Sequence, residues 1–218
     1  MAYRLIIGNK NYSSWSLRPW LLMKHSGLPF EEVWIPFGTA EFKLRVLEYS
    51  PAGKVPVLVD GDITVWDSLA ICEYLAERHP GLKLWPQAAA ERALARSISA
   101  EMHSGFMNLR TLMPMNCRKI FPGKGHTPEV LQDVARIVGI WQDCRARYAT
   151  SGPFLFGHFT IADAMYAPVV LRFRTYAVDL PAESRAYVDD IFALPAMREW
   201  LAAAHEEVET ISQFEPYA

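Results

Sequence analysis

The chain has 218 residues, with 22 Lys and Arg against 24 Asp and Glu and a formal net charge of −2. Because basic and acidic residues are mixed along the chain, this composition excludes the electrostatic footprint of a protein that binds nucleic acid or an anionic membrane surface. Hydrophobic residues make up 51% of the chain, ample for a core, yet no apolar run approaches membrane-spanning length and the N-terminal run is too short for a signal peptide, so we expect a cytoplasmic protein.

Short β-rich runs alternate with helical ones as far as Pro80. The predicted strands lie near Tyr3–Gly8, Glu31–Phe37, Val57–Val59 and Ile63–Trp66, and the predicted helices lie near Ser16–Ser26, Glu41–Tyr49 and Ser68–Arg78. Asp60-Gly61 predicts a hairpin turn between the last two strands. This order predicts a compact α/β domain over residues 1–80.

Almost everything after Pro80 is predicted to be helical, and the change of composition from His79 to Pro86 marks a domain boundary. Long helices are predicted over Ala88–Met113 and Glu129–Thr150. Thr160-Ile161-Ala162-Asp163 predicts a capping box, which we assign to structure, at the start of a helix through Leu171 that is apolar nearly all round and therefore buried. The chain thus predicts an all-helical domain over residues 87–218.

The hydroxyl cluster Ser13-Ser14-Trp15-Ser16 lies at the turn between the first predicted strand and the first predicted helix. Backbone N–H groups and the positive end of the helix dipole meet at such a turn, which can hold a thiolate, a phosphate or a carboxylate. Serine is also a common helix N-cap, so this segment alone fits a structural role as well as a functional one.

The cysteines and histidines predict neither a disulfide framework nor a metal site. Cys72, Cys117 and Cys144 are odd in number and far apart, which fits a reducing compartment. The six histidines show no paired metal-ligand spacing.

Two further segments add to the serine turn: Ser50–Gly61, a turn followed by an X-Pro junction, a strand and a hairpin, and Asp67–Leu75, a helix with a capping-type pair. With Phe159–Asp163, these segments resemble the cytosolic glutathione transferase family, closest to its serine-type zeta and theta classes and their bacterial relatives. The resemblance covers the whole chain. It implies a thioredoxin-like glutathione-binding domain, a helical domain that forms the electrophile site, glutathione as co-substrate, no metal, and a homodimer.

The resemblance implies that Ser13 donates a hydrogen bond to the glutathione thiolate, with the adjacent Ser14 as a rival. Lowering a thiol pKa from about 8.5 by about two units requires about 2.7 kcal/mol of preferential stabilisation of the anion. A hydrogen bond to a charged group contributes about 1.5–3 kcal/mol and a helix N-terminus adds up to about 1 kcal/mol. One serine donor at the start of a helix is therefore sufficient, and it acts as a donor and not as a nucleophile.

The resemblance also places the rest of glutathione. Val55-Pro56 resembles the family's cis-proline junction, which presents the backbone of the preceding residue to the cysteinyl part, and Lys54 is within reach of the glycyl carboxylate. Asp67 and Ser68 suit the ammonium and the carboxylate of the γ-glutamyl group. A solvated loop lysine and ordinary helix capping explain Lys54, Asp67 and Ser68 nearly as well.

On the electrophile side, Trp15 stands where the zeta class has cysteine, which argues against zeta-type isomerase chemistry, and its ring can wall the electrophile pocket. Met102 and Phe106 share one face of the predicted helix, and His103 and Arg110 share a neighbouring face that can border the cleft between the domains.

The leading functional hypothesis is therefore a glutathione transferase that conjugates the thiolate to a small apolar electrophile. A glutathione-dependent cis–trans isomerase of the maleylacetoacetate type and a non-enzymatic glutathione-binding interaction protein are the alternatives. A disulfide reductase would need cysteine at the serine turn, and a serine hydrolase would need a Gly-x-Ser-x-Gly elbow; the chain has neither.

Overall fold

A four-stranded sheet forms the centre of the first domain in the computed structural model, which describes residues 3–217 and so leaves residues 1, 2 and 218 of the predicted domains outside the described part. The strand order is β2-β1-β3-β4, with β1 (Tyr3–Ile7), β2 (Phe30–Trp34), β3 (Val57–Asp60) and β4 (Ile63–Trp66). β1 pairs parallel with β2 and antiparallel with β3, and β3 pairs antiparallel with β4.

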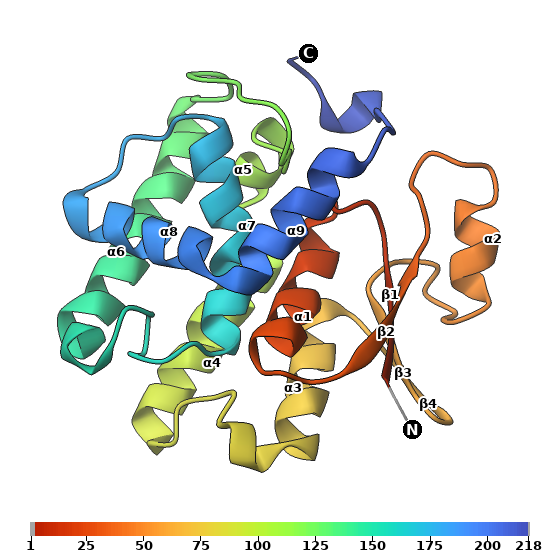
Figure 1. Ribbon diagram of the computed structural model, residues 1–218. Coiled ribbons are helices and arrows are strands. Elements are labelled where there is room, and N and C mark those ends of the chain that lie inside the picture. The colour runs from red at the N-terminus through yellow and green to blue at the C-terminus, as the bar shows by residue number, and fades with distance from the viewer. Residues whose placement is uncertain (1–2, 218) are drawn as a thin grey trace.

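Helices cover both faces of this sheet (Figure 1). Because successive side chains of a strand point to opposite faces, Leu5 and Ile7 pack with α1 (Ser14–His25) and α3 (Ser68–Arg78), and Ile6 packs toward α2 (Phe42–Leu47). The predicted thioredoxin-like arrangement is confirmed.

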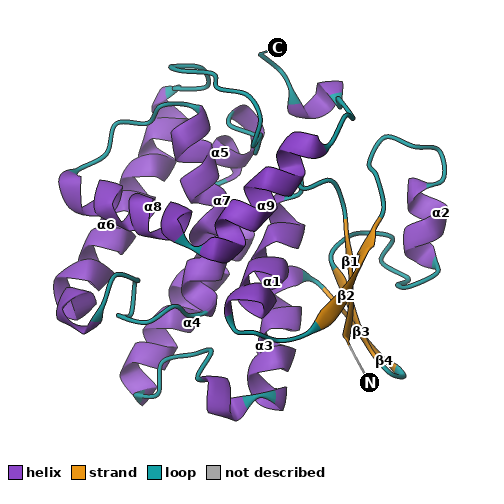
Figure 2. Ribbon diagram, viewed as in Figure 1, coloured by secondary structure: helices purple, strands orange, loops and turns teal. Residues whose placement is uncertain are grey.

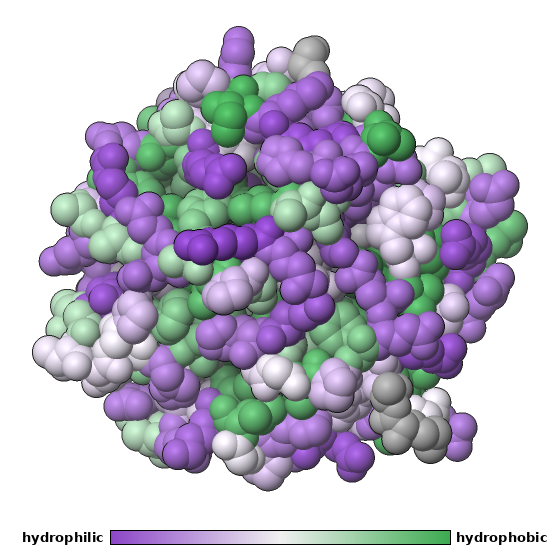
Figure 3. Space-filling model, viewed as in Figure 1, coloured by the Kyte–Doolittle hydropathy of each residue, from purple (hydrophilic) through white to green (hydrophobic). Residues whose placement is uncertain are grey.

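The second domain consists of helices, as Figure 2 shows. They are α4 (Ala89–Ser104), α5 (Met107–Leu112), α6 (Pro128–Tyr148), α7 (Ile161–Thr175), α8 (Ala182–Ala193) and α9 (Pro195–Glu206), with short 3-10 helices at Pro80–Leu82, Ala149–Ser151 and Ser212–Phe214. As predicted, α7 is buried on nearly every side, and α1 packs against both α7 and α9, which joins the two domains. On the face drawn in Figure 3, apolar side chains gather over the helices between polar ones. Within residues 3–217, no helix is both long and apolar enough to cross a bilayer.

The prediction of one helix over Ala88–Met113 is wrong, because the chain breaks at Gly105 and Phe106 between α4 and α5. A Cβ on Gly105 would lie 2.8 Å from the Glu101 carbonyl oxygen, and Phe106 has a left-handed backbone with φ 60°. The Arg110 guanidinium folds back from α5 and donates to the carbonyl oxygens of Gly105 and His103 at the end of α4. The Arg110 guanidinium therefore satisfies the last carbonyl groups of α4, and its positive charge interacts favourably with the negative end of the helix dipole.

The predicted capping box at the start of α7 is present, and Asp163 is fully buried within it. Its carboxylate accepts from the N–H of Thr160 at 2.8 Å, from the N–H of Leu155 at 3.0 Å and from the Tyr187 hydroxyl at 3.2 Å. Burial raises the pKa of Asp163, and these hydrogen bonds oppose the rise. Thr160 and Asp163 are therefore structural residues.

Replacing Thr160 with alanine should lower the free energy of unfolding by about 1 kcal/mol, because the N-cap oxygen of α7 is lost. Urea denaturation of the purified variant measures this loss, with Thr210→Ala at an exposed position as the control. A loss indistinguishable from that of the control would contradict a structural role of the capping box.

Candidate active site

The turn between β1 and α1 holds the predicted serines at the edge of a cavity of about 340 Å³. Ser13 is the N-cap of α1, and its Oγ accepts from the Ser16 N–H at 3.3 Å. The Ser13 hydroxyl donates to the Ser16 Oγ at 2.7 Å, and that oxygen also accepts from the Gly8 N–H. If the two hydroxyls rotate, the Ser16 hydroxyl donates to the Ser13 Oγ instead. The Ser13 hydrogen is then free to bind an anion in the cavity.

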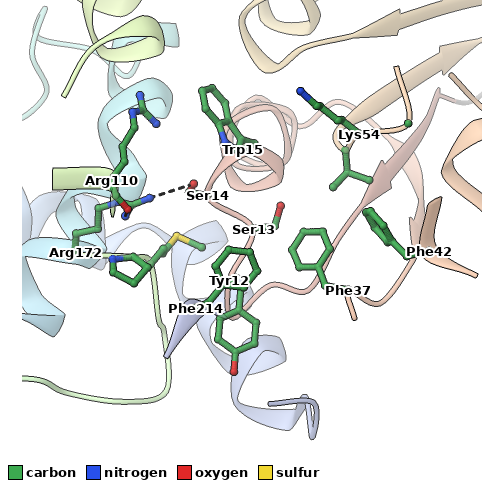
Figure 4. A pocket seen from close by; sticks show the side chains of 14 residues that line it. Tyr12, Ser13, Ser14, Trp15, Phe37, Phe42, Lys54, Arg110, Arg172 and Phe214 are labelled. Atoms are coloured by element: carbon green, nitrogen blue, oxygen red, sulfur yellow. Dashed lines mark hydrogen bonds between the residues drawn. The ribbon is translucent and has the colours of Figure 1, made fainter. Parts of the chain in front are cut away.

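Ser14 faces the same cavity and is held by a cation from the helical domain. Its Oγ lies 3.3 Å from Nη2 of Arg172 on α7, as the dashed line in Figure 4 shows. Because a guanidinium only donates, the Ser14 oxygen is the acceptor and its own hydrogen stays free. Ser14 is therefore a second hydroxyl donor beside Ser13.

Arg172 and Arg110 make one end of this cavity positive (Figure 4). Arg172 also donates to the backbone oxygens of Met113 and Arg110. Burial and the neighbouring Arg110 lower the pKa of Arg172 to about 9, so that its guanidinium is charged at pH 7. In the described part of the chain, no carboxylate lies within 4.0 Å of either guanidinium. This end of the cavity therefore suits an anionic group.

Aromatic side chains form much of the remaining wall and come from three separate segments of the chain: Tyr12, Trp15, Phe37, Phe42 and Phe214. The Arg110 guanidinium lies 4.9 Å from the centroid of the Trp15 ring, so the aromatic wall continues to the cationic end. The cavity can hold an aromatic or unsaturated group with an anion at one end.

The C-terminal segment carries Phe214 into this wall and is held there by Glu215. The Phe214 ring stacks on the Tyr12 ring at 5.5 Å, and the Tyr12 hydroxyl donates to the buried Glu215 carboxylate at 2.6 Å. Asn116 and Lys119 also donate to this carboxylate, at 3.2 and 2.5 Å. Burial raises the pKa of Glu215, but the hydrogen bonds from Lys119 and Tyr12 outweigh it and hold this pKa below its usual range.

Glu215→Gln should therefore lower the free energy of unfolding by about 1 kcal/mol at pH 7. Since the folded-state pKa is lowered, the contribution is present above the unfolded-state pKa of about 4.3 and is lost as the pH falls through the folded-state value. Thermal melts from pH 7 to pH 3 should show the difference between the wild type and the variant shrinking toward acid. Glu77→Gln at an exposed position is the control, and a difference independent of pH would refute this role of the carboxylate.

A second cavity, of about 500 Å³, adjoins the first. It is lined by all five residues that the sequence analysis assigned to glutathione, namely Lys54, Val55, Pro56, Asp67 and Ser68. The Val55-Pro56 peptide bond is cis, as predicted. Trp15, Lys54 and Val55 line both cavities, so the two form one continuous site between the serine turn and the start of α3.

Asp67 caps α3 and also contacts the helical domain. Its Oδ1 accepts from the N–H groups of Leu69 and Ala70, and its Oδ2 lies 3.1 Å from Nε2 of His103 on α4. The His103 ring lies edge-on to the Trp15 ring at 5.2 Å. Burial lowers the pKa of His103; the carboxylate of Asp67 opposes this effect, and the smaller effects of Arg18 and Arg110 add to it.

Two family models match the sequence: "Glutathione S-transferase, N-terminal domain" over residues 12–78 and "Glutathione S-transferase, C-terminal domain" over residues 118–203. The maleylacetoacetate isomerase of Rattus norvegicus is 30% identical over 182 residues, which cover 77% of this chain and 76% of the relative. The chain belongs to the glutathione S-transferase family. A probable maleylacetoacetate isomerase of Caenorhabditis elegans is 29% identical over 81% of this chain and 89% of its own length.

Solved glutathione S-transferase structures share the fold. A Burkholderia glutathione transferase homologue with bound glutathione has a TM-score of 0.73 at 22% identity, covering 95% of this chain and 100% of its own. A diazinon-metabolizing glutathione S-transferase of the silkworm Bombyx mori has a TM-score of 0.73 at 20% identity, covering 96% of this chain and 100% of its own. The predicted combination of a thioredoxin-like domain and a helical domain is thus confirmed as the glutathione S-transferase fold.

The predicted electrophile residues of this glutathione S-transferase divide into two groups. Trp15 and Arg110 line the first cavity. Met102 and Phe106 line neither cavity, and both side chains lie in the core, where they are 2% and 9% exposed. His103 also lies outside the cavity linings and contacts three residues of the site, Asp67, Trp15 and Arg110.

The sequence analysis missed Tyr12, Arg172 and Phe214. Arg172 had a detectable signal, since an arginine within a helix that is apolar nearly all round has no solvated face to occupy. Tyr12 and Phe214 had none, because 202 positions separate the two rings that stack.

Proposed function

We propose that this chain is a glutathione transferase in which the glutathione thiolate, held at the start of α1, attacks an electrophile in the aromatic cavity. The observation that carries this proposal is the continuous site in which two buried serines at a helix N-terminus adjoin the cavity lined by Lys54, Val55 and Ser68. The hydroxyls of Ser13 and Ser14 and the α1 dipole stabilise the thiolate, which is the nucleophile.

Glutathione would occupy the larger cavity and end at the serines. Asp67 and Ser68, which line this cavity, would bind the ammonium and the carboxylate of the γ-glutamyl group, and the backbone of Val55 would pair with the cysteinyl part. Lys54 is exposed and lines both cavities, so its ammonium can approach the glycyl carboxylate as a point charge.

The electrophile site supports a narrower substrate class than a small apolar molecule. Its aromatic walls suit an aromatic or unsaturated body, and the guanidinium groups of Arg110 and Arg172 suit an anionic group such as a carboxylate. In conjugation, the thiolate forms a carbon–sulfur bond to the electrophilic carbon. The displaced electron pair leaves with a leaving group or is protonated after addition to a double bond.

Isomerisation is the second candidate function, and the same two arginines favour it. The relatives from rat and Caenorhabditis elegans carry the name maleylacetoacetate isomerase. In such a reaction the thiolate adds to a conjugated double bond, the resulting single bond rotates, and the thiolate leaves, which regenerates glutathione. By its resemblance to the zeta class, the chain has Trp15 where that class has cysteine, so we rank conjugation first.

Calorimetric titration of the purified protein with glutathione tests both candidates together, and the absence of heat at millimolar glutathione would contradict both. A panel of electrophiles and maleyl-type isomerase substrates then separates them. Consumption of glutathione in step with product indicates conjugation, whereas product formed at constant glutathione indicates isomerisation.

We also propose a cytoplasmic homodimer. Among residues 3–217, β4 is an edge strand with one side unpaired, and its Ile63 and Trp66 side chains are 48% and 46% exposed, a feature that favours association. Sedimentation should show a dimer at micromolar concentration, and Ile63→Glu should shift it toward the monomer. Leu131→Glu, at a similarly exposed position on α6, is the control, and a monomeric wild type would refute the dimer.

A further inference from the structure

Arg18 on α1 is a buried cation that forms no ion pair among the described residues. It is 1% exposed, and its guanidinium lies 4.3 Å from the centroid of the Trp15 ring. Nη1 donates to the Ser68 Oγ at 3.4 Å, and Nε is buried without a hydrogen-bond partner in residues 3–217. A buried charge without a counter-ion is unfavourable, so this arrangement calls for an anion nearby.

The surrounding charges do not cancel that of Arg18. Burial and the like charges of Arg110 and Arg172 lower the pKa of Arg18 to about 9, which leaves it charged at pH 7. The carboxylate of Asp67 opposes this effect, but it is one negative charge beside the three guanidinium groups of Arg18, Arg110 and Arg172. The start of α3 therefore lies in a positive field.

Arg18 also fixes the role of the Ser68 hydroxyl. A guanidinium only donates hydrogen bonds, so the Ser68 Oγ accepts and its own hydrogen is left for another partner. Ser68 lines the larger cavity and is the first residue of α3, where its N–H has no intrahelical acceptor. It therefore presents an O–H and an N–H donor to the cavity, with a cation behind them.

We propose that Arg18 is a positioning residue of the glutathione site, which holds the Ser68 hydroxyl as a donor to the α-carboxylate of the γ-glutamyl group and stabilises that carboxylate from behind. The inference rests on the proposed function and deepens it. The sequence analysis assigned only Ser68 to this carboxylate, and Arg18 adds the charge that the carboxylate requires. Arg18 therefore contributes to the affinity for glutathione through the γ-glutamyl carboxylate and not through the thiol.

The test compares two ligands that differ in that carboxylate alone: glutathione and γ-aminobutyryl-cysteinyl-glycine. Calorimetric titration of the full chain gives the ratio of their dissociation constants. For the wild type, glutathione should bind about tenfold to a hundredfold more tightly, since charge-assisted hydrogen bonds are lost with the carboxylate.

Arg18→Met and Ser68→Ala should each reduce this ratio to about threefold or less, and the double variant should reduce it no further, because the two residues act as a unit. Arg18→Lys keeps the positive charge but lacks the planar guanidinium with its fixed donor geometry, so it should give an intermediate ratio. Arg185→Met removes an exposed arginine of α8 that lines neither cavity, and its ratio should equal that of the wild type.

An unchanged ratio in Arg18→Met or in Ser68→Ala would overturn the inference, even if the affinity for both ligands fell, since a structural defect weakens both alike. Circular dichroism establishes whether Arg18→Met is folded. If it is not, Ser68→Ala and Arg18→Lys decide the matter in the same way. A wild type that binds neither ligand would contradict the proposed function, whereas a wild type that binds both equally would contradict this inference alone.

Discussion

Replacing Ser13 with alanine should raise the pKa of the bound glutathione thiol by about 1 to 2 pH units and slow the reaction about tenfold to a hundredfold at neutral pH. The Ser13 hydrogen bond favours only the charged form of the sulfur, so the affinity for glutathione should change little. Ultraviolet titration of the bound thiolate measures the pKa directly. Ser97→Ala, at an exposed position on α4, is the control and should leave it unchanged.

Ser14→Ala should raise this pKa by about half a pH unit or less. The Arg172 guanidinium, which donates to Ser14 at 3.3 Å, loses its acceptor in this variant and can face the sulfur directly, so its charge offsets the missing hydroxyl. An unchanged pKa in Ser13→Ala together with a raised one in Ser14→Ala would assign the thiolate donor to Ser14. If neither variant changes the pKa, the backbone N–H groups and the dipole of α1 activate the thiol, and neither serine is the donor.

The features that could be predicted from the sequence are those set by neighbouring residues. The short first strand, the serine turn, the Val55-Pro56 junction and the Thr160–Asp163 capping box each depend on residues within a few positions of one another, and each is present in the structure. The larger cavity follows the same rule, because its predicted residues occupy two short segments at the start of β3 and of α3.

The features that could not be predicted depend on distant contacts. A helical pattern runs across Gly105, and the hydrogen bonds by which the Arg110 side chain satisfies the carbonyl oxygens at the end of α4 are visible only in the structure. The wall of the electrophile cavity is assembled by Phe214 stacking on Tyr12 and by Arg172 reaching Ser14. No local periodicity encodes these contacts, so the substrate class that we propose rests on the structure and not on the sequence.

Arg172→Met should reduce kcat/KM for an electrophile that carries a carboxylate by about tenfold to a hundredfold relative to the methyl ester of the same molecule. The acid and its methyl ester are compared within each variant, so each protein serves as its own reference. Loss of the Arg172 charge also destabilises the thiolate and so raises the pKa of the thiol. This effect slows the reactions of the acid and of the ester equally, so it cancels in the ratio of their kcat/KM values. Arg172→Lys keeps a charge without the bidentate geometry and should restore the preference in part.

Arg110→Met tests the same positive end of the cavity from α5 and should reduce the preference for the carboxylate in the same direction. Arg185→Met, on the exposed surface of α8, is the matched control and should leave the ratio at the wild-type value. Circular dichroism shows whether each variant is folded, since Arg172 also donates to the Met113 carbonyl oxygen. If the acid and its ester keep the same relative kcat/KM in both cavity variants, the two arginines do not recognise the substrate, and the electrophile is the small apolar molecule that the sequence predicted.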